Sequence, residues 1–146
     1  ECTISNMNIS DKELAILNRL SNLESLQLND CNFSNKTKVE LNIKNLIIND
    51  CENVNISLYE DIKTLSRLQI VNCKNINLKG ISKLSNLSEI LLQNISMNNI
   101  DEILGVKSLK KLNLNGSKIE NLDKINKMPN LYIEHEEING LYDEEY

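Results

Sequence analysis

The chain has 146 residues, with 16 Lys and Arg against 21 Asp and Glu, and carries a formal net charge of −5. This length suits one ordinary domain, and 40% hydrophobic with 25% charged residues is the balance of a folded globular protein, not of a disordered tail. The acidic balance argues against a general nucleic-acid binder, and no apolar run reaches the roughly 18 residues that membrane insertion requires.

The N-terminal segment has neither a basic start nor an apolar stretch, so it does not predict a signal peptide. Ser10 and Glu13 form the S-x-x-E pattern that caps a helix, and leucines follow at helical spacing. We therefore expect a short helix over 11–19. A further helical turn is expected over 101–106, an extended segment over 32–41, and single 3₁₀ turns in the other connections.

A nine-residue pattern of apolar positions recurs along the whole chain, with successive copies ending 19 to 24 residues apart. The copies read LESLQLNDC (23–31), IKNLIINDC (43–51), LSRLQIVNC (65–73), LSEILLQNI (87–95) and LKKLNLNGS (109–117), with a truncated first copy ending at Met7 and a degenerate last copy, MPNLYIEHE (128–136). We expect a single domain over 1–146 with repeats ending near 7, 31, 51, 73, 95, 117 and 136, and residues 137–146 as a C-terminal cap.

The alternation inside each copy is that of a strand with one buried face. Identical short strands joined by connections of about a dozen residues stack as a parallel sheet. The predicted strands lie near 2–6, 25–29, 45–49, 67–71, 89–93, 111–115 and 130–134. The predicted inner pairs are Leu26/Leu28, Leu46/Ile48, Leu68/Ile70, Ile90/Leu92, Leu112/Leu114 and Leu131/Ile133.

The copies resemble the leucine-rich repeat, L-x-x-L-x-L-x-x-[N/C], over essentially the whole chain. They are similar to the 22-residue class of bacterial internalins and of the regulatory subunits of protein phosphatase 1. The resemblance implies an α/β fold: a right-handed solenoid with a parallel concave sheet of about seven strands, and short helices or 3₁₀ turns on the convex side. Likeness to internalins implies adhesion to a host protein, and likeness to phosphatase regulators implies intracellular scaffolding.

Cys31, Cys51 and Cys73 occupy the ninth position, which in this family points inward and bonds the loop backbone. We interpret them as a column of buried, reduced thiols. A Cys31–Cys51 or Cys51–Cys73 disulfide is geometrically conceivable, because stacked copies lie about 5 Å apart. Zinc is not expected, because the sequence has no C-x-x-C pairs. Reduced thiols favour a cytoplasmic location, with a secreted or cell-surface location as the alternative.

The position before the ninth residue is occupied mostly by Asn and Asp, which tolerate the left-handed backbone of a tight turn. These residues are Asn6, Asp30, Asp50, Asn72, Asn94, Gly116 and His135. His135 is the only histidine, and the sequence has no glycine-rich phosphate loop, no H-E-x-x-H motif and no evident acid/base pair. We therefore expect no enzyme activity, no cofactor and no metal site.

Most outward strand positions are neutral and polar, but Ile47, Val71 and Leu91 are apolar in three consecutive repeats. We expect an exposed apolar patch around them, since such patches mark binding sites. The other candidate contact residues are Gln69, the charged Arg67, Glu89 and Lys111, and Tyr132. The predicted function is a non-catalytic module that binds a protein partner on its concave face. The alternative is the recognition domain of a larger secreted, surface-adhesion or effector protein.

Overall fold

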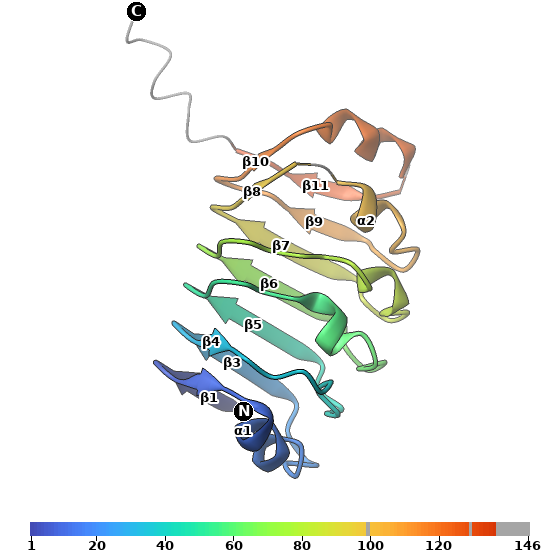
Figure 1. Ribbon diagram of the computed structural model, residues 1–146. Coiled ribbons are helices and arrows are strands. Elements are labelled where there is room, and N and C mark those ends of the chain that lie inside the picture. The colour runs from blue at the N-terminus through green and yellow to red at the C-terminus, as the bar shows by residue number, and fades with distance from the viewer. Residues whose placement is uncertain (99, 129, 137–146) are drawn as a thin grey trace, which may run out of the picture.

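The computed structural model describes residues 1–98, 100–128 and 130–136. Seven strands form one parallel sheet in which each strand lies beside the next in chain order (Figure 1). They are β1 (Cys2–Ser5), β3 (Ser25–Asn29), β5 (Asn45–Asn49), β6 (Arg67–Val71), β7 (Glu89–Gln93), β9 (Lys111–Asn113) and β11 (Tyr132–Glu134). The expected α/β fold with a seven-stranded parallel sheet is confirmed. The predicted cap at 137–146 lies outside the described residues.

Alternate side chains of each strand point to one side of the sheet and form two ladders there. The ladders are Leu26, Leu46, Leu68, Ile90 and Leu112, and Leu28, Ile48, Ile70, Leu92 and Leu114; all ten are at most 2% exposed. Parallel strands lie about 4.8 Å apart, so each side chain packs on its counterparts above and below. Full burial of one such side chain contributes about 1.5–3 kcal/mol. Contacts between successive turns of the chain therefore form the core.

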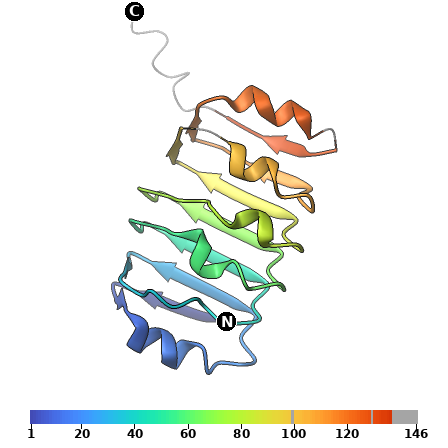
Figure 2. The ribbon, with the colours of Figure 1, turned by 45° about the vertical axis from the view of Figure 1, so that its right-hand side comes forward.

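Short helices and turns cover this inner side of the sheet (Figure 2). They are α1 (Asp11–Leu17), η1 (Ile56–Tyr59), η2 (Ile81–Lys83), α2 (Asp101–Leu104) and η3 (Leu122–Lys127). Two small parallel pairs accompany them, β2 (Asn8–Ile9) with β4 (Asn32–Phe33) and β8 (Ser96–Met97) with β10 (Lys118–Ile119). No helix in the described ranges is long and apolar enough to cross a bilayer.

The capping motif starts α1 as expected. The Ser10 N–H donates to Glu13 Oε2 at 3.0 Å, and the Lys12 N–H donates to Ser10 Oγ at 3.3 Å. The helix ends at Leu17, two residues earlier than predicted. After it, Asn18 Oδ1 accepts the Glu40 N–H at 3.0 Å and ties the extended segment of the next turn to the helix.

The turns that leave the strands adopt the left-handed backbone predicted from their Asn and Asp residues. The φ angles are 57° at Asn6, 51° at Asp30, 55° at Asp50, 56° at Asn72, 54° at Asn94 and 76° at Gly116. Asn and Asp accept this conformation because their short side chains bond the local backbone. His135 is the seventh residue predicted to adopt this conformation, but its φ angle is not positive.

The cysteine column is buried, and its thiols are free. The Cys31 N–H donates to Cys51 Sγ at 3.3 Å, and the Cys51 N–H donates to Cys73 Sγ at 3.4 Å. The Cys51 thiol in turn donates to the Leu28 carbonyl at 3.7 Å. Each thiol thus bonds the backbone of the preceding turn. The neighbouring Cys73 thiol and burial both raise the pKa of Cys51, so it stays protonated.

The last strand corrects the predicted register. Tyr132 pairs with Lys111 and Ile133 with Leu112, whereas the sequence pattern set Leu131 opposite Leu112. The predicted repeat was two residues too short to cross the inner side of the sheet, where η3 alone takes six residues. The shift also explains His135. Its Nε2 lies 3.1 Å from the Ser117 carbonyl, beyond the end of β11, not in a left-handed turn.

A buried carboxylate links three turns on the inner side. Glu60 is 7% exposed, and its Oε1 lies 2.7 Å from Lys38 Nζ and 3.4 Å from Lys83 Nζ. Its Oε2 lies only 2.3 Å from the position that a Cβ would take at Gly80, and Gly80 has a φ of 96°. Glycine is therefore favoured there by the backbone, since a side chain is strained at this φ, whereas the flexible Glu60 side chain could move aside. The Lys38 ammonium holds the pKa of Glu60 below its usual value.

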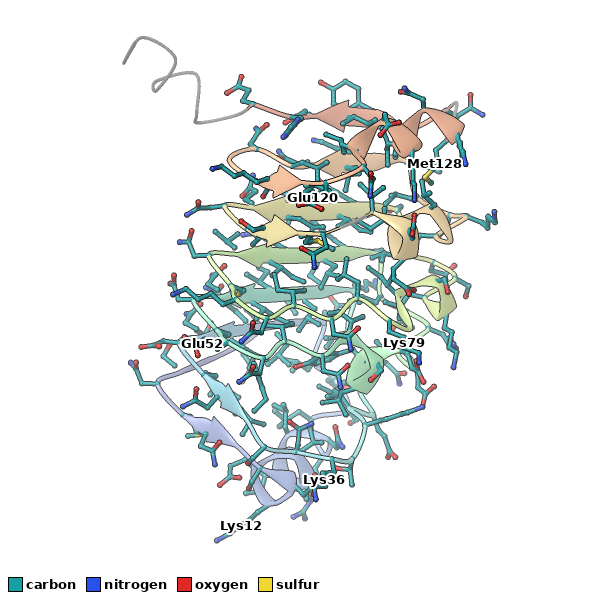
Figure 3. The ribbon with its side chains drawn as sticks, turned by 45° about the horizontal axis from the view of Figure 1, so that its top comes forward. Lys12, Lys36, Glu52, Lys79, Glu120 and Met128 are labelled. Carbon is teal, nitrogen blue, oxygen red and sulfur yellow. The ribbon has the colours of Figure 1, made fainter. Side chains whose placement is uncertain are left out.

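We expect Glu60→Gln to lower the thermal midpoint at pH 7 and to flatten the acid limb of the stability curve. A carboxyl whose pKa is depressed on folding contributes stability above its unfolded value near 4.5, and loses it as the pH falls through the folded value. Thermal melts between about pH 2.5 and pH 7 measure both effects, since this window spans the titration of a carboxyl group. Glu52→Gln, at an exposed carboxylate, is the control (Figure 3). Equal pH profiles for the two variants would contradict the proposed contribution of the Glu60 carboxylate to stability.

We expect Cys51→Val to destabilise the fold and Cys51→Ser to do so much less. Valine leaves the Cys31 N–H without its partner, at about 1–3 kcal/mol for a buried unpaired group. Serine can replace the thiol, since Ser117 Oγ accepts the Ile95 N–H at 3.1 Å and donates to the Leu92 carbonyl at 2.7 Å. Urea unfolding measures the difference. A valine variant as stable as the serine variant would refute the role of the thiol.

Candidate functional site

The side of the sheet away from the helices, here called the open face, carries the outward side chains of the strands. Strand register arranges them in three columns. The first is Ser25, Asn45, Arg67, Glu89, Lys111 and Tyr132; the second is Gln27, Ile47, Gln69, Leu91, Asn113 and Glu134; the third is Asn29, Asn49, Val71 and Gln93. The open face is therefore polar, with three aliphatic positions near its middle.

Ile47 and Val71 are the apolar members that water reaches. Both are half-buried, and they lie diagonally on the adjacent strands β5 and β6, since Ile47 pairs with Gln69 and Asn49 with Val71. Gln69 lies directly opposite Ile47, two residues before Val71 on β6, and is half-buried too. These three residues form what we call the central patch. Diagonal neighbours on adjacent strands are close enough for one ligand group to touch both.

Leu91 does not belong to the exposed patch that the sequence predicted. It is 8% exposed, although it points to the open face. Its register neighbours are Gln69 and Asn113, and Asn113 is itself buried and accepts a hydrogen bond from Gln93 Nε2 at 3.2 Å, so closely packed polar side chains flank it. The expectation of an exposed Leu91 was wrong, because polar neighbours on the same face exclude water from it.

The charged residues pair with one another along the first column. Arg67 Nε lies 3.3 Å from Glu89 Oε1, and Glu89 Oε2 lies 3.8 Å from Lys111 Nζ. Lys111 Nζ lies 3.7 Å from Glu134 Oε1, which extends the chain of charges to β11. Partly exposed pairs contribute only about 0–1 kcal/mol each, so a partner's charge can compete for them. Arg67, Glu89 and Lys111 thus lie together as predicted.

Amide side chains on either side of the central patch bond to each other. On one side, Gln27 Nε2 and Asn49 Nδ2 both donate to Asn29 Oδ1, at 3.1 and 3.0 Å. On the other, Asn113 Nδ2 donates to Glu134 Oε2 at 2.9 Å. The Gln69 amide, by contrast, has no hydrogen bond to any residue that the structure describes. The central patch thus offers a polar group and apolar surface that its neighbours in the described ranges leave available.

Tyr132 lies apart from the central patch. The register shift places it in the first column beside Lys111, not opposite Asn113 as the sequence suggested. It is 60% exposed at the far edge of the sheet. The sequence therefore identified an exposed aromatic side chain correctly but assigned it to the wrong column.

Metal-binding side chains do not gather in residues 1–98, 100–128 and 130–136. Within these ranges, no cluster of three or more His, Cys, Asp or Glu side chains could hold a metal ion. The His135 ring lies within hydrogen-bond distance of the Ser117 carbonyl. The Ser117 hydroxyl is already hydrogen-bonded, because it donates to the Leu92 carbonyl of the preceding turn. No protein-family model matches this chain, and no curated protein matches its sequence.

Sequence reasoning missed the amide networks and one groove. Gln93, Asn113 and Glu134 bond across strands, and the alternation of outward positions could have indicated them once the last register was right. A separate groove of about 410 Å³ lies where the last two connections lead into β9 and β11. It is lined by Leu104, Leu109, Met128, Leu131 and two lysines. Its residues come from two connections, so no single motif predicts it.

We expect Leu91→Ala to destabilise the protein by about 2 kcal/mol or more, as a buried leucine does, despite its place on the open face. Ile47→Ala should cost less, because Ile47 is only half-buried. Urea unfolding of the two variants measures the order. Equal losses would mean that Leu91 is no better covered in solution than Ile47.

Proposed function

We propose that the chain is a leucine-rich-repeat solenoid that acts as a non-catalytic protein-binding module. The spacing of the strands, the inward ladders and the thiol column that bonds the preceding turn all support this fold. A stack of turns that each contact only their neighbours offers a rigid, extended face for a partner. The proposed binding surface is the open face, centred on the central patch of Ile47, Gln69 and Val71.

The observation that carries the proposal is the contrast between the central patch and its surroundings. The flanking amides are tied to each other, and the charged column pairs internally, whereas Gln69 has no partner in the described part of the chain and Ile47 and Val71 have partly exposed apolar surface. Desolvated apolar anchors with a polar rim concentrate binding energy in protein interfaces. A protein segment could place an apolar side chain against Ile47 and Val71 and hydrogen-bond the Gln69 amide with its backbone.

The proposed rim is the series of ion pairs formed by Arg67, Glu89 and Lys111 of the first column and Glu134 of the second. Its four alternating charges repel neither an acidic nor a basic partner strongly, so they orient the partner more than they attract it. Leu91 is not an anchor in this proposal, because its side chain is covered. Tyr132 is a peripheral contact that only a partner extending to β11 would reach.

The same surface serves the alternative, in which the module is the recognition part of a larger secreted, surface-adhesion or effector protein. We favour a cytoplasmic module because the described thiols are all free. Both versions use the central patch and differ in the compartment that holds the partner.

The test compares the proteins that cross-link to wild type and to Val71→Asp in native lysate, followed by affinity measurement with the purified partner. We expect Ile47→Asp and Val71→Asp each to cost at least about 2 kcal/mol, or roughly 30-fold in Kd, as hot-spot residues do. The matched control is Ile16→Asp, since Ile16 is 62% exposed on α1, away from the open face. A partner that binds all three variants as tightly as wild type would place the site elsewhere.

A further inference from the structure

The groove at the last turns combines apolar surface with positive charge. Its apolar lining is Leu104, Leu109, Met128 and Leu131, and Lys107 and Lys127 lie at its rim. Three of the four apolar side chains are only half-buried, whereas the side chains of the core ladders are buried. Met128 lies at the end of the stack opposite to Lys12 (Figure 3).

The two lysines are available to bind an anion. Both are exposed, and neither has a carboxylate partner among residues 1–98, 100–128 and 130–136. Lys124, on the same connection as Lys127, is by contrast already paired, since its Nζ lies 3.0 Å from Asp101 Oδ1. An apolar groove flanked by two available ammonium groups fits a segment that carries apolar side chains next to carboxylates.

One stretch of this chain has that composition. Residues 137–146 read EINGLYDEEY, with apolar Ile138, Leu141 and Tyr142 followed directly by Asp143, Glu144 and Glu145. We propose that the groove binds this acidic segment of the same chain, with Tyr142 against Leu131 and with the carboxylates near Lys107 and Lys127.

The length of the segment permits this contact. From Glu136 back to Leu131 is five residues of extended chain, or about 17 Å. Asp143 is the seventh residue after Glu136, and seven extended residues reach up to ~23 Å, so its carboxylate can return to the groove. Binding within one chain also needs no second molecule, because the linker holds the segment at a high effective concentration.

This contact would give the last turn an outer layer of apolar and acidic groups. Leu122, Met128, Leu131 and Ile133 are all partly exposed there, whereas Leu112, the partner of Ile133 on β9, is fully buried. A terminal repeat needs such a cover, since otherwise its apolar side invites association with another molecule. The proposal is independent of the open face, because the two surfaces share no residue.

The test uses methyl NMR of the full chain, with the Met128 methyl group as the reporter and Met7 and Met97 as internal references. Neutralising the segment by Asp143→Asn, Glu144→Gln and Glu145→Gln should shift the Met128 resonance and leave Met7 unchanged. Reversing the rim by Lys107→Glu and Lys127→Glu should shift Met128 in the same way. Combining both sets should add no further shift, since the contact is already lost.

The matched control is Lys12→Glu with Lys79→Glu, which reverses two exposed lysines outside the groove (Figure 3). Rescue comes from joining Lys107→Glu and Lys127→Glu with Asp143→Lys, Glu144→Lys and Glu145→Lys, which should restore the wild-type Met128 resonance. A Met128 resonance unaffected by the segment variants would overturn the proposal. A wild-type resonance that moves on dilution would show contact between two copies and would also overturn binding within one chain.

Discussion

The fold depends on a constraint that no single turn can meet: a short strand buries its inner side chains only against the strands on either side of it. Leu46 and Leu68 are fully buried because each packs on its counterparts in the adjacent strands. The same dependence applies to polar groups. The Cys31 N–H is satisfied by the thiol of the following turn, and the Cys51 N–H by the next one. Apolar burial and backbone hydrogen bonding therefore require the same register, and this shared requirement fixes it.

The register then determines what the open face can do. Outward residues with the same place in each repeat become neighbours, so a polar side chain meets a polar side chain on each adjacent strand. Asn29 collects donors from Gln27 and Asn49, and Arg67, Glu89 and Lys111 form one alternating series. Most of the face is engaged in such internal contacts. Function is consequently to be sought where the columns interrupt this pairing, which is at Ile47, Gln69 and Val71.

The sequence predicted the regular part of the molecule well, because the inner ladder positions recur at 20 to 22 residues through the middle of the chain. Strands β3, β5, β6 and β7 have their expected bounds, and the left-handed turns follow from Asn and Asp at one position. Prediction failed where the pattern was short. In the last copy, Leu131 and Ile133 look like an inner pair, but a repeat must also span the helical side, and that length decides the register. The side-chain pattern identifies candidate inner residues, but it does not show how many residues the connection needs.

The candidate site shows a different limit of prediction. Alternation assigns Leu91 to the open face correctly, yet Leu91 is almost fully buried, and its neighbour Asn113 is buried as well and accepts a hydrogen bond from Gln93. The column in which a residue lies thus shows to which face its side chain points, but not whether water reaches that side chain. An aliphatic residue can therefore lie on an otherwise polar face without marking a binding site, because close packing of its neighbours removes it from water as a core would. Of three apolar positions in consecutive repeats, Ile47 and Val71 are the two that remain half-buried, so they are the ones that a partner can reach. This distinction requires the geometry of all the strands around them.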